Sequence, residues 1–144
     1  MTKDVLITMK GVQRMDGQED ETEILTRGNY YWKNGKHYLL FESQMSESMA
    51  PVKMKVKIAP GCLDILMSGE VSTHLVFQEN QPHRANYVTP MGTIVIDMEA
   101  SKVLLEESED RICLEFDYTL DLNGSRMFTS SNILEAKSVG VRNV

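Results

Sequence analysis

Four polar side chains around one predicted turn have the clearest capacity for binding chemistry. If Asn34-Gly35 forms a two-residue hairpin turn, counting outwards from it places Arg27, Tyr31, Tyr38 and Glu42 on one face of the flanking strands. A charge-assisted pair beside two phenols could orient a polar ligand inside an apolar barrel. If this face points outwards, the pair is instead an ordinary exposed ion pair of small energetic value.

The opposite face of the same hairpin is more apolar. It carries Tyr30, Trp32, His37, Leu39 and Phe41. On hydrophobicity alone this second face is the inner one, so the outward orientation of the polar face is favoured. Both orientations stay open at this point.

Two further ligand-binding candidates, Tyr87 and Thr89, share a strand face with Ala85 and are expected near a barrel mouth. A packed tyrosine whose hydroxyl reaches solvent or a backbone carbonyl is the favoured alternative. Methionines also fall on apolar faces, at Met9, Met54, Met98 and Met127. Flexible thioethers suit a cavity that accepts varied apolar ligands, and they equally suit an irregular core, which is favoured.

The sequence predicts no catalytic residue, no metal site and no cofactor. The three histidines, His37, His74 and His83, lie in no motif that pairs a nucleophile with a base. Cys62 and Cys113 lack companion cysteines at metal-ligand spacing. An enzyme is therefore less well supported than a binding protein.

The length and net charge of the chain limit its domain organisation and the classes of partner it can bind. A chain of 144 residues is expected to form one domain over residues 1–144, with a core over about 4–136 and a tail over 137–144. Its net charge of -6 disfavours nucleic acid as a partner. Two cysteines and an N-terminus without a long apolar segment predict a cytoplasmic protein that has no membrane partner.

Alternation of apolar and polar residues with a period of two dominates the chain and predicts strands with one buried face. The expected strands cover 4–12, 21–32, 36–44, 52–58, 62–68, 72–78, 84–89, 93–100, 102–107, 112–121 and 125–136. Short turns separate most of them, so neighbouring strands must be antiparallel. Closing the sheet removes its exposed edges, which predicts a single all-β, antiparallel up-and-down barrel of about eight to ten strands.

A second turn, Asn123-Gly124, predicts another register. Counting from it pairs Asp121 with Arg126, Leu120 with Met127, Tyr118 with Thr129 and Leu114 with Ile133. The one longer connection, residues 45–51, could cap a barrel mouth, although an ordinary flexible loop is favoured.

The order of these segments resembles the YwiB-like family of uncharacterised bacterial β-barrel proteins. The resemblance rests on Thr26–Tyr31, Tyr38–Glu42, the Lys-Val-Lys-Ile strand, Met67-Ser68-Gly69 and Tyr87–Gly92. Leu40 stands where the family usually has an aromatic residue, and Met67 stands where many members have arginine. The resemblance implies a calycin-like, lipocalin-like barrel of a domain of unknown function, in a bacterial cytosol.

These observations together predict a non-enzymatic binding module for a small, partly apolar or amphipathic molecule. The alternative is a protein–protein interaction module or homodimer with a filled barrel, whose exposed aromatic side chains act as anchors.

Overall fold

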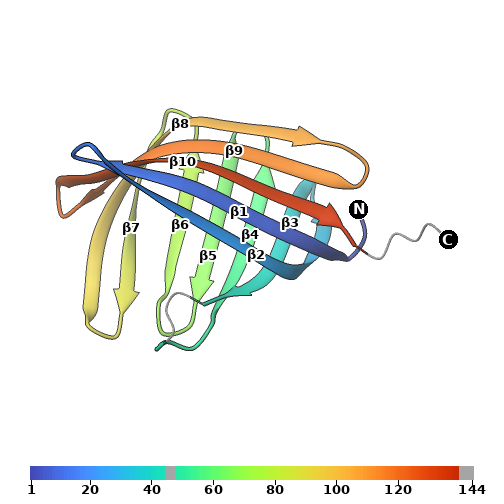
Figure 1. Ribbon diagram of the computed structural model, residues 1–144, viewed down its shortest axis with the longest axis horizontal. Coiled ribbons are helices and arrows are strands. Elements are labelled where there is room, and N and C mark those ends of the chain that lie inside the picture. Colours follow the sequence, from blue (N-terminus) through green and yellow to red (C-terminus); the bar gives the residue numbers. More distant parts are fainter. Residues whose placement is uncertain (45–47, 140–144) are drawn as a thin grey trace.

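The computed structural model describes residues 1–44 and 48–139 and shows a rolled antiparallel sheet of ten strands (Figure 1). The strands are β1 Asp4–Met15, β2 Gln18–Lys33, β3 Lys36–Ser43, β4 Val52–Ala59, β5 Cys62–Ser68, β6 Thr73–Gln78, β7 Pro82–Thr89, β8 Gly92–Glu107, β9 Arg111–Leu122 and β10 Ser125–Ser138. The described residues contain no helix, and therefore none that is long and apolar enough to cross a membrane. The expected tail begins inside β10, and residues 140–144 lie outside the described residues.

Strand order confirms the predicted all-β barrel. The strands follow the order β6-β5-β4-β3-β2-β1-β10-β9-β8-β7, so each pairs with a sequence neighbour except where β1 meets β10. That ladder runs from Val5 opposite Ser138 to Arg14 opposite Thr129 and joins the two ends of the chain. The first and last strands of the order, β6 and β7, complete the wall with few bonds, so the barrel is nearly closed.

The β6–β7 seam is held at its two ends. Ser72 and Val88 exchange backbone hydrogen bonds of 3.0 and 2.9 Å, and Gln81 N donates to Gln78 O at 3.0 Å. The turn between the strands is fastened to β8, where Asn80 N donates to the Ala100 carbonyl at 2.7 Å. Regular ladder pairs between β6 and β7 are absent among the described residues.

The predicted register of the β2–β3 hairpin is confirmed near its turn. Asn34 and Gly35 both have positive φ, 54° and 74°, as a two-residue hairpin turn of this type requires. Trp32 lies opposite His37, and Tyr31 lies opposite Tyr38. The ladder ends at Asn29 opposite Leu40, so the expected pairing of Arg27 with Glu42 is not part of it.

The predicted register of the β9–β10 hairpin is wrong beyond its first pair. Asp121 lies opposite Arg126 as expected, but a β-bulge at Met127 then shifts the ladder by one residue. Leu120 consequently lies opposite Phe128, Tyr118 opposite Ser130, and Leu114 opposite Leu134. An extra residue in one strand reverses which later side chains face inwards, because the side-chain period of a strand is two.

A second β-bulge lies where the sequence analysis expected the end of one strand and the start of another. The segments 93–100 and 102–107, expected as two strands, form the single strand β8, which pairs with β9 on both sides of Ser101. The ladder shifts between Ala100 and Lys102, and just beyond it Val103 N donates to Glu79 Oε2 at 3.3 Å. A bulge lets one long strand bend across the barrel without being interrupted.

The interior is filled at one end of the barrel, which we call the packed end. This end carries the turns at 34–35, 60–61 and 108–110 and the first and last described strand residues. Its core side chains are between 0 and 3% exposed: Val5, Ile7, Leu39, Val56, Ile58, Leu63, Val103, Ile112, Leu114, Leu134 and Ala136. Close packing of these aliphatic side chains stabilises the fold by removing apolar surface from water.

A buried histidine joins two parts of the packed end. His37 is 6% exposed; its Nδ1 lies 2.8 Å from the Tyr30 hydroxyl, and its Nε2 lies 3.2 Å from Glu107 Oε1. The Trp32 ring meets the imidazole edge-on, with ring centroids 4.8 Å apart. Because Glu107 ends β8, this cluster connects the β2–β3 hairpin to a strand on the other side of the barrel.

Gly28 marks a place where the packing leaves no room for a side chain. A Cβ at this position would lie 2.5 Å from Ile7 Cδ1 and 2.8 Å from the Leu40 carbonyl oxygen. We expect Gly28→Ala to lower the free energy of unfolding by about 1–3 kcal/mol, because the neighbours must shift. Urea denaturation measures this change. Arg27→Ala, at the exposed neighbouring position, is the control and should stay within about 0.5 kcal/mol of the wild type; equal stability of the two variants would contradict the crowding.

Candidate functional site

The other half of the barrel, which we call the hollow end, contains a partly open cavity of about 500 Å³. It carries the turns at 16–17, 69–72, 90–91 and 123–124. Aliphatic and thioether side chains line most of it: Met9, Ile24, Met54, Ile65, Met67, Leu75, Ile94, Ile96, Leu120, Leu122 and Met127. Aromatic side chains complete the apolar wall: Phe77, Tyr87, Phe116, Tyr118 and Phe128. A cavity of this size and character is typical of small-molecule sites.

The cavity arises because the inner side chains change along each strand. On β1 the inward series runs from the fully buried Val5 and Ile7 to the half-buried Met9. On β9 it runs from the buried Leu114 to the half-buried Leu120. Side chains from opposite walls therefore meet at the packed end and leave a space at the hollow end.

Two polar side chains interrupt the apolar wall, Ser43 and Asn132, and we call the surroundings of Asn132 the polar corner. Asn132 is 9% exposed; its Oδ1 accepts a hydrogen bond from Ser130 Oγ at 3.1 Å, and its Nδ2 donates to the Phe116 carbonyl at 3.2 Å. Gln13 Nε2 in turn donates to Ser130 Oγ at 3.1 Å. This chain of bonds fixes the orientation of the Asn132 amide where it meets the cavity.

The phenols beside the cavity are held in their neutral form. Burial raises the pKa of Tyr118 above the ordinary value of 10.0, and a hydrogen bond with Ser130 offsets part of that rise. Burial also raises the pKa of Tyr87. Low dielectric surroundings penalise the charged form, so both phenols act as neutral hydrogen-bonding groups at neutral pH.

The predicted methionines lie inside the barrel. Met9, Met54 and Met127 line the cavity, whereas Met98 is 2% exposed and belongs to the packed core. Met67, which the sequence analysis did not single out in this role, also lines the cavity. The methionines therefore occur both in the cavity wall and in the packed core, and their contact with a ligand stays a prediction.

The four polar candidates from the β2–β3 hairpin lie on the outer face. Arg27, Tyr31 and Glu42 are exposed and Tyr38 is half-buried, while the opposite face, with His37 and Leu39, points inwards. Of the two orientations that the sequence left open, the structure shows the favoured outward one, because the more apolar face of the hairpin turns to the core. Their role as ligand-binding residues is not tested and stays a prediction.

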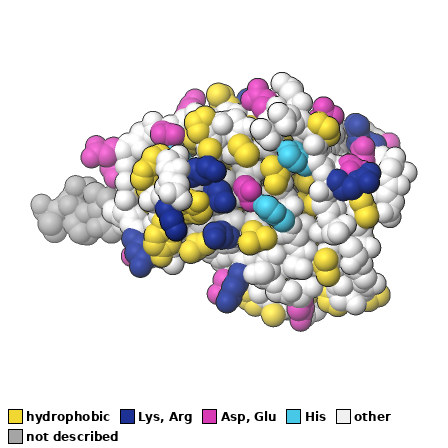
Figure 2. Space-filling view, turned by 180° about the vertical axis from the view of Figure 1, so that it is seen from behind, with side chains coloured by type: hydrophobic (Ala, Val, Ile, Leu, Met, Phe, Trp, Pro, Cys, Tyr) yellow, Lys and Arg dark blue, Asp and Glu magenta, His cyan; other side chains and the backbone are white. Residues whose placement is uncertain are grey.

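The outer surface around these residues has a basic character. Lys55 and Lys57 on β4 place their Nζ atoms 5.9 and 5.6 Å from the centroid of the Tyr38 ring. Arg27 and Glu42 line one shallow depression of about 430 Å³. Figure 2, which views the molecule from behind, shows basic side chains gathered among exposed hydrophobic ones, without a deep hollow.

The remaining two candidates, Tyr87 and Thr89, have different surroundings in the structure. Tyr87 lines the cavity, whereas Thr89 does not. The Thr89 hydroxyl donates to the Gly92 carbonyl at 2.9 Å and accepts a bond from Met91 N at 3.2 Å. Thr89 therefore stabilises the β7–β8 turn, and Tyr87 is the only one of the six polar and phenolic candidates that lines the cavity.

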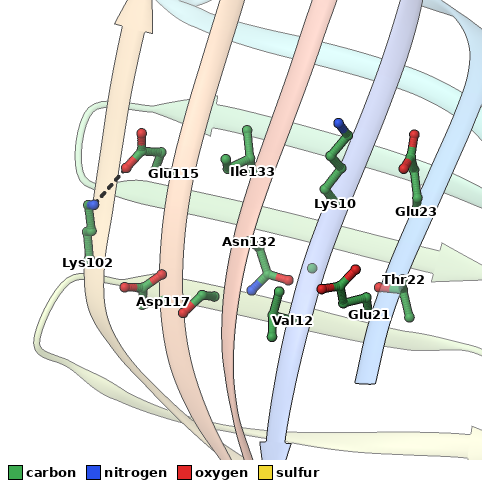
Figure 3. Close-up of a pocket in the computed structure, with 12 residues that line it drawn as sticks. Lys10, Val12, Glu21, Thr22, Glu23, Lys102, Glu115, Asp117, Asn132 and Ile133 are labelled. Atoms are coloured by element: carbon green, nitrogen blue, oxygen red, sulfur yellow. Dashed lines mark hydrogen bonds and ion pairs between the residues drawn. The ribbon is translucent and has the colours of Figure 1, made fainter. Parts of the chain in front are cut away.

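A second concave surface of about 680 Å³ lies outside the barrel across β8, β9, β10, β1 and β2 (Figure 3). Six of its twelve lining residues are charged, and Lys102 Nζ lies 2.7 Å from Glu115 Oε2. Gly11 and Asn132 also border this surface, so Asn132 lies between it and the cavity. Lys10 and Ile133 stand on neighbouring strands beside this pair. A surface with this many charged side chains is a weaker candidate site for a small apolar ligand than the apolar cavity.

The described residues contain no group of three or more metal-ligating side chains. His74 Nε2 lies 2.6 Å from Asp64 Oδ1, but this pair is on the exposed outer surface, away from the cavity. The loop 45–51 is only partly described: Met45–Glu47 lie outside the described residues, and Met49 packs against the core.

Asn132 is the site residue that the sequence analysis missed. The count from Asn123-Gly124 ignored the bulge and placed Ile133 inside, which put Asn132 outside. A signal was present in Glu135, whose carboxylate pairs with the Arg111 guanidinium on the outer face. Fixing Glu135 outside places Leu134, Asn132 and Ser130 inside, since alternate residues share a face.

Comparison with known proteins gives a consistent picture. Residues 7–135 match the family described as Domain of unknown function (DUF1934). The chain is 26% identical over 115 residues to the Uncharacterized beta-barrel protein YwiB of Bacillus subtilis (strain 168), covering 78% of this chain and 80% of that protein. It also resembles the crystal structure of the ywiB protein from Bacillus subtilis, with a TM-score of 0.85 and 20% identity over 94% of this chain and 92% of the other.

The raised pKa of Tyr118 predicts a dependence of stability on alkaline pH. A folded-state pKa above 10.0 means that this contribution to stability is fully present below 10.0 and is lost as the pH rises through the folded value. We expect an alkaline ultraviolet titration to show a late tyrosinate fraction from Tyr30, Tyr87 and Tyr118, which Tyr118→Phe reduces. Urea denaturation on both sides of the transition should show that the wild type loses more stability than Tyr118→Phe. An identical loss would contradict the burial of the phenol.

Proposed function

We propose that this chain, which belongs to the family described as Domain of unknown function (DUF1934), binds a small, partly apolar molecule inside its barrel without chemically changing it. One observation supports this most directly: half of the barrel is hollow, with a cavity of about 500 Å³. Apolar surface that faces such a space favours a guest that removes it from water.

The composition of the wall supports binding of more than one guest shape. Met9, Met54, Met67 and Met127 line the cavity, and their unbranched side chains can adopt several rotamers at small cost. Aromatic walls such as Phe77 and Tyr118, whose ring centroids are 4.6 Å apart, give a more rigid apolar surface. Together they favour recognition by bulk and hydrophobicity over recognition by many polar contacts.

We also propose that the protein is cytoplasmic. Cys62 and Cys113 are both free thiols in the structure. Unpaired cysteines are common in a reducing compartment, whereas secreted domains of this size more often carry disulfides.

Docking through the outer surface is the alternative function. Trp32 is 59% exposed and Tyr31 is 40% exposed on the β2–β3 hairpin, and exposed aromatic residues often anchor protein interfaces. Sedimentation velocity at several concentrations separates the two functions: a ligand carrier stays monomeric, whereas a homodimer gains mass. The hollow end counts against the filled barrel that this alternative predicted.

Filling the cavity should weaken ligand binding. We expect Leu75→Trp, inside the cavity, to weaken binding of the neutral dye N-phenyl-1-naphthylamine at least tenfold, or about 1.4 kcal/mol, because the indole occupies the space. Dye fluorescence measures the affinity. Thermal stability should be kept or rise, since filling a void adds contacts.

Leu66→Trp provides the matched control. Leu66 belongs to the neighbouring strand β5 but is 44% exposed on the outer face, so the same substitution leaves the cavity empty. Dye binding equal to the wild type is expected. If the wild type binds no dye, or if both variants lose binding equally, the cavity is not the binding site.

A further inference from the structure

We propose that the barrel selects an electrically neutral, amphipathic ligand whose hydroxyl, carbonyl or amide end bonds to Asn132. This inference rests on the proposed function and adds the chemical class of the ligand. The argument uses the charge of the cavity wall, the fixed amide of Asn132 and the room that Gly11 leaves for it.

The wall carries no charge that could balance an ion. Lysine, arginine, histidine, aspartate and glutamate are all absent among the described residues that line the cavity. A carboxylate or ammonium that entered would lose its water shell and gain no counter-ion, which is costly in an apolar surrounding. The phenols of Tyr87 and Tyr118 stay neutral for the same reason.

The electrostatic field outside the protein also disfavours the binding of anions. The net charge of -6 repels a negatively charged molecule before it reaches the barrel. A neutral ligand neither loses the water shell of an ion nor is repelled by the net charge.

Asn132 supplies a defined polar contact for the end of such a ligand. Its two hydrogen bonds, from Ser130 and to the Phe116 carbonyl, use one of its two acceptor sites and one of its two donors. One donor and one acceptor therefore remain on an amide whose orientation is fixed. A hydroxyl or a primary amide presents the complementary pair without carrying charge.

Gly11 gives the amide its position. It lies directly opposite Asn132 in the β1–β10 ladder, and a Cβ at Gly11 would come within 2.6 Å of Asn132 Oδ1. The absence of a side chain on β1 allows Asn132 to lie over the strand instead of filling the cavity. The polar corner and the open space are thus built by the same pair of residues.

The test compares ligands that share one apolar chain and differ only in the end group. 1-Octanol, octanamide, octanoate and octylammonium compete at pH 7.5 with N-phenyl-1-naphthylamine for the purified full chain. We expect the two neutral compounds to displace the dye at concentrations at least tenfold lower than either ion. The dye and its sulfonated relative 1-anilinonaphthalene-8-sulfonate make a second pair, in which the neutral dye should bind more tightly.

A substitution tests the role of Asn132 separately. Asn132→Leu keeps a similar size and removes both hydrogen-bonding groups, so the affinity for 1-octanol should fall about tenfold while that for the dye is kept. Ile133→Leu, at the exposed neighbouring position, is the control and should leave both affinities unchanged. Ser130→Ala, which removes the bond that orients the amide, replaces Asn132→Leu if that variant does not fold.

The outcomes separate the two proposals. If an ion displaces the dye as well as the neutral compounds do, or if the dye binds and no octyl compound displaces it, neutral selection is wrong and cavity binding stands. Unchanged 1-octanol affinity in the folded variants overturns the role of Asn132. If neither the dye nor any octyl compound binds the wild type, the proposed function itself fails.

Discussion

The β1–β10 ladder is the contact on which the barrel depends. Every other ladder joins strands that follow one another in the sequence, whereas this one pairs Val5 with Ser138 and Arg14 with Thr129. Bringing such distant segments together costs chain entropy, which the apolar burial at the packed end must offset. The same ladder sets Gly11 opposite Asn132, so closing the sheet also builds the polar corner of the cavity.

The bulge at Met127 determines what that closure places inside. By adding one residue to β10, it turns Ser130 and Asn132 towards the interior and leaves Ile133 45% exposed on the surface. It also keeps Glu135 outside, where the carboxylate pairs with Arg111. A barrel without this bulge would place a different set of β10 side chains in its cavity, so one inserted residue defines the chemistry of the site.

Much of the architecture could be predicted because it depends on local pattern. Alternation located the strands, and the Asn34-Gly35 turn gave the correct register from Lys33 to Asn29. Bulges are different, because a period-two count passes through them unnoticed; the β8 segments and the pairing of Leu114 were misjudged for that reason. The greater hydrophobicity of the opposite face correctly favoured an outward orientation of the face that carries Arg27. The alternation of side chains along the strand singled out Tyr87, which lines the cavity. The hollow end could not be predicted from the sequence, since the distance between opposite walls depends on the curvature and tilt of the whole sheet.

The β6–β7 seam makes this barrel mechanically unlike a cylinder that is bonded around its full circumference. In a fully bonded barrel the strand number and stagger fix the diameter, and widening it breaks a ladder. Here the wall can part along one line by releasing the mutual bonds of Ser72 and Val88, while the nine ladders of the described strands stay intact. Leu75 and Phe77 on one side of that line and Tyr87 on the other all line the cavity. Parting of the wall along this line would widen the hollow end without breaking a ladder of the packed core at the other end.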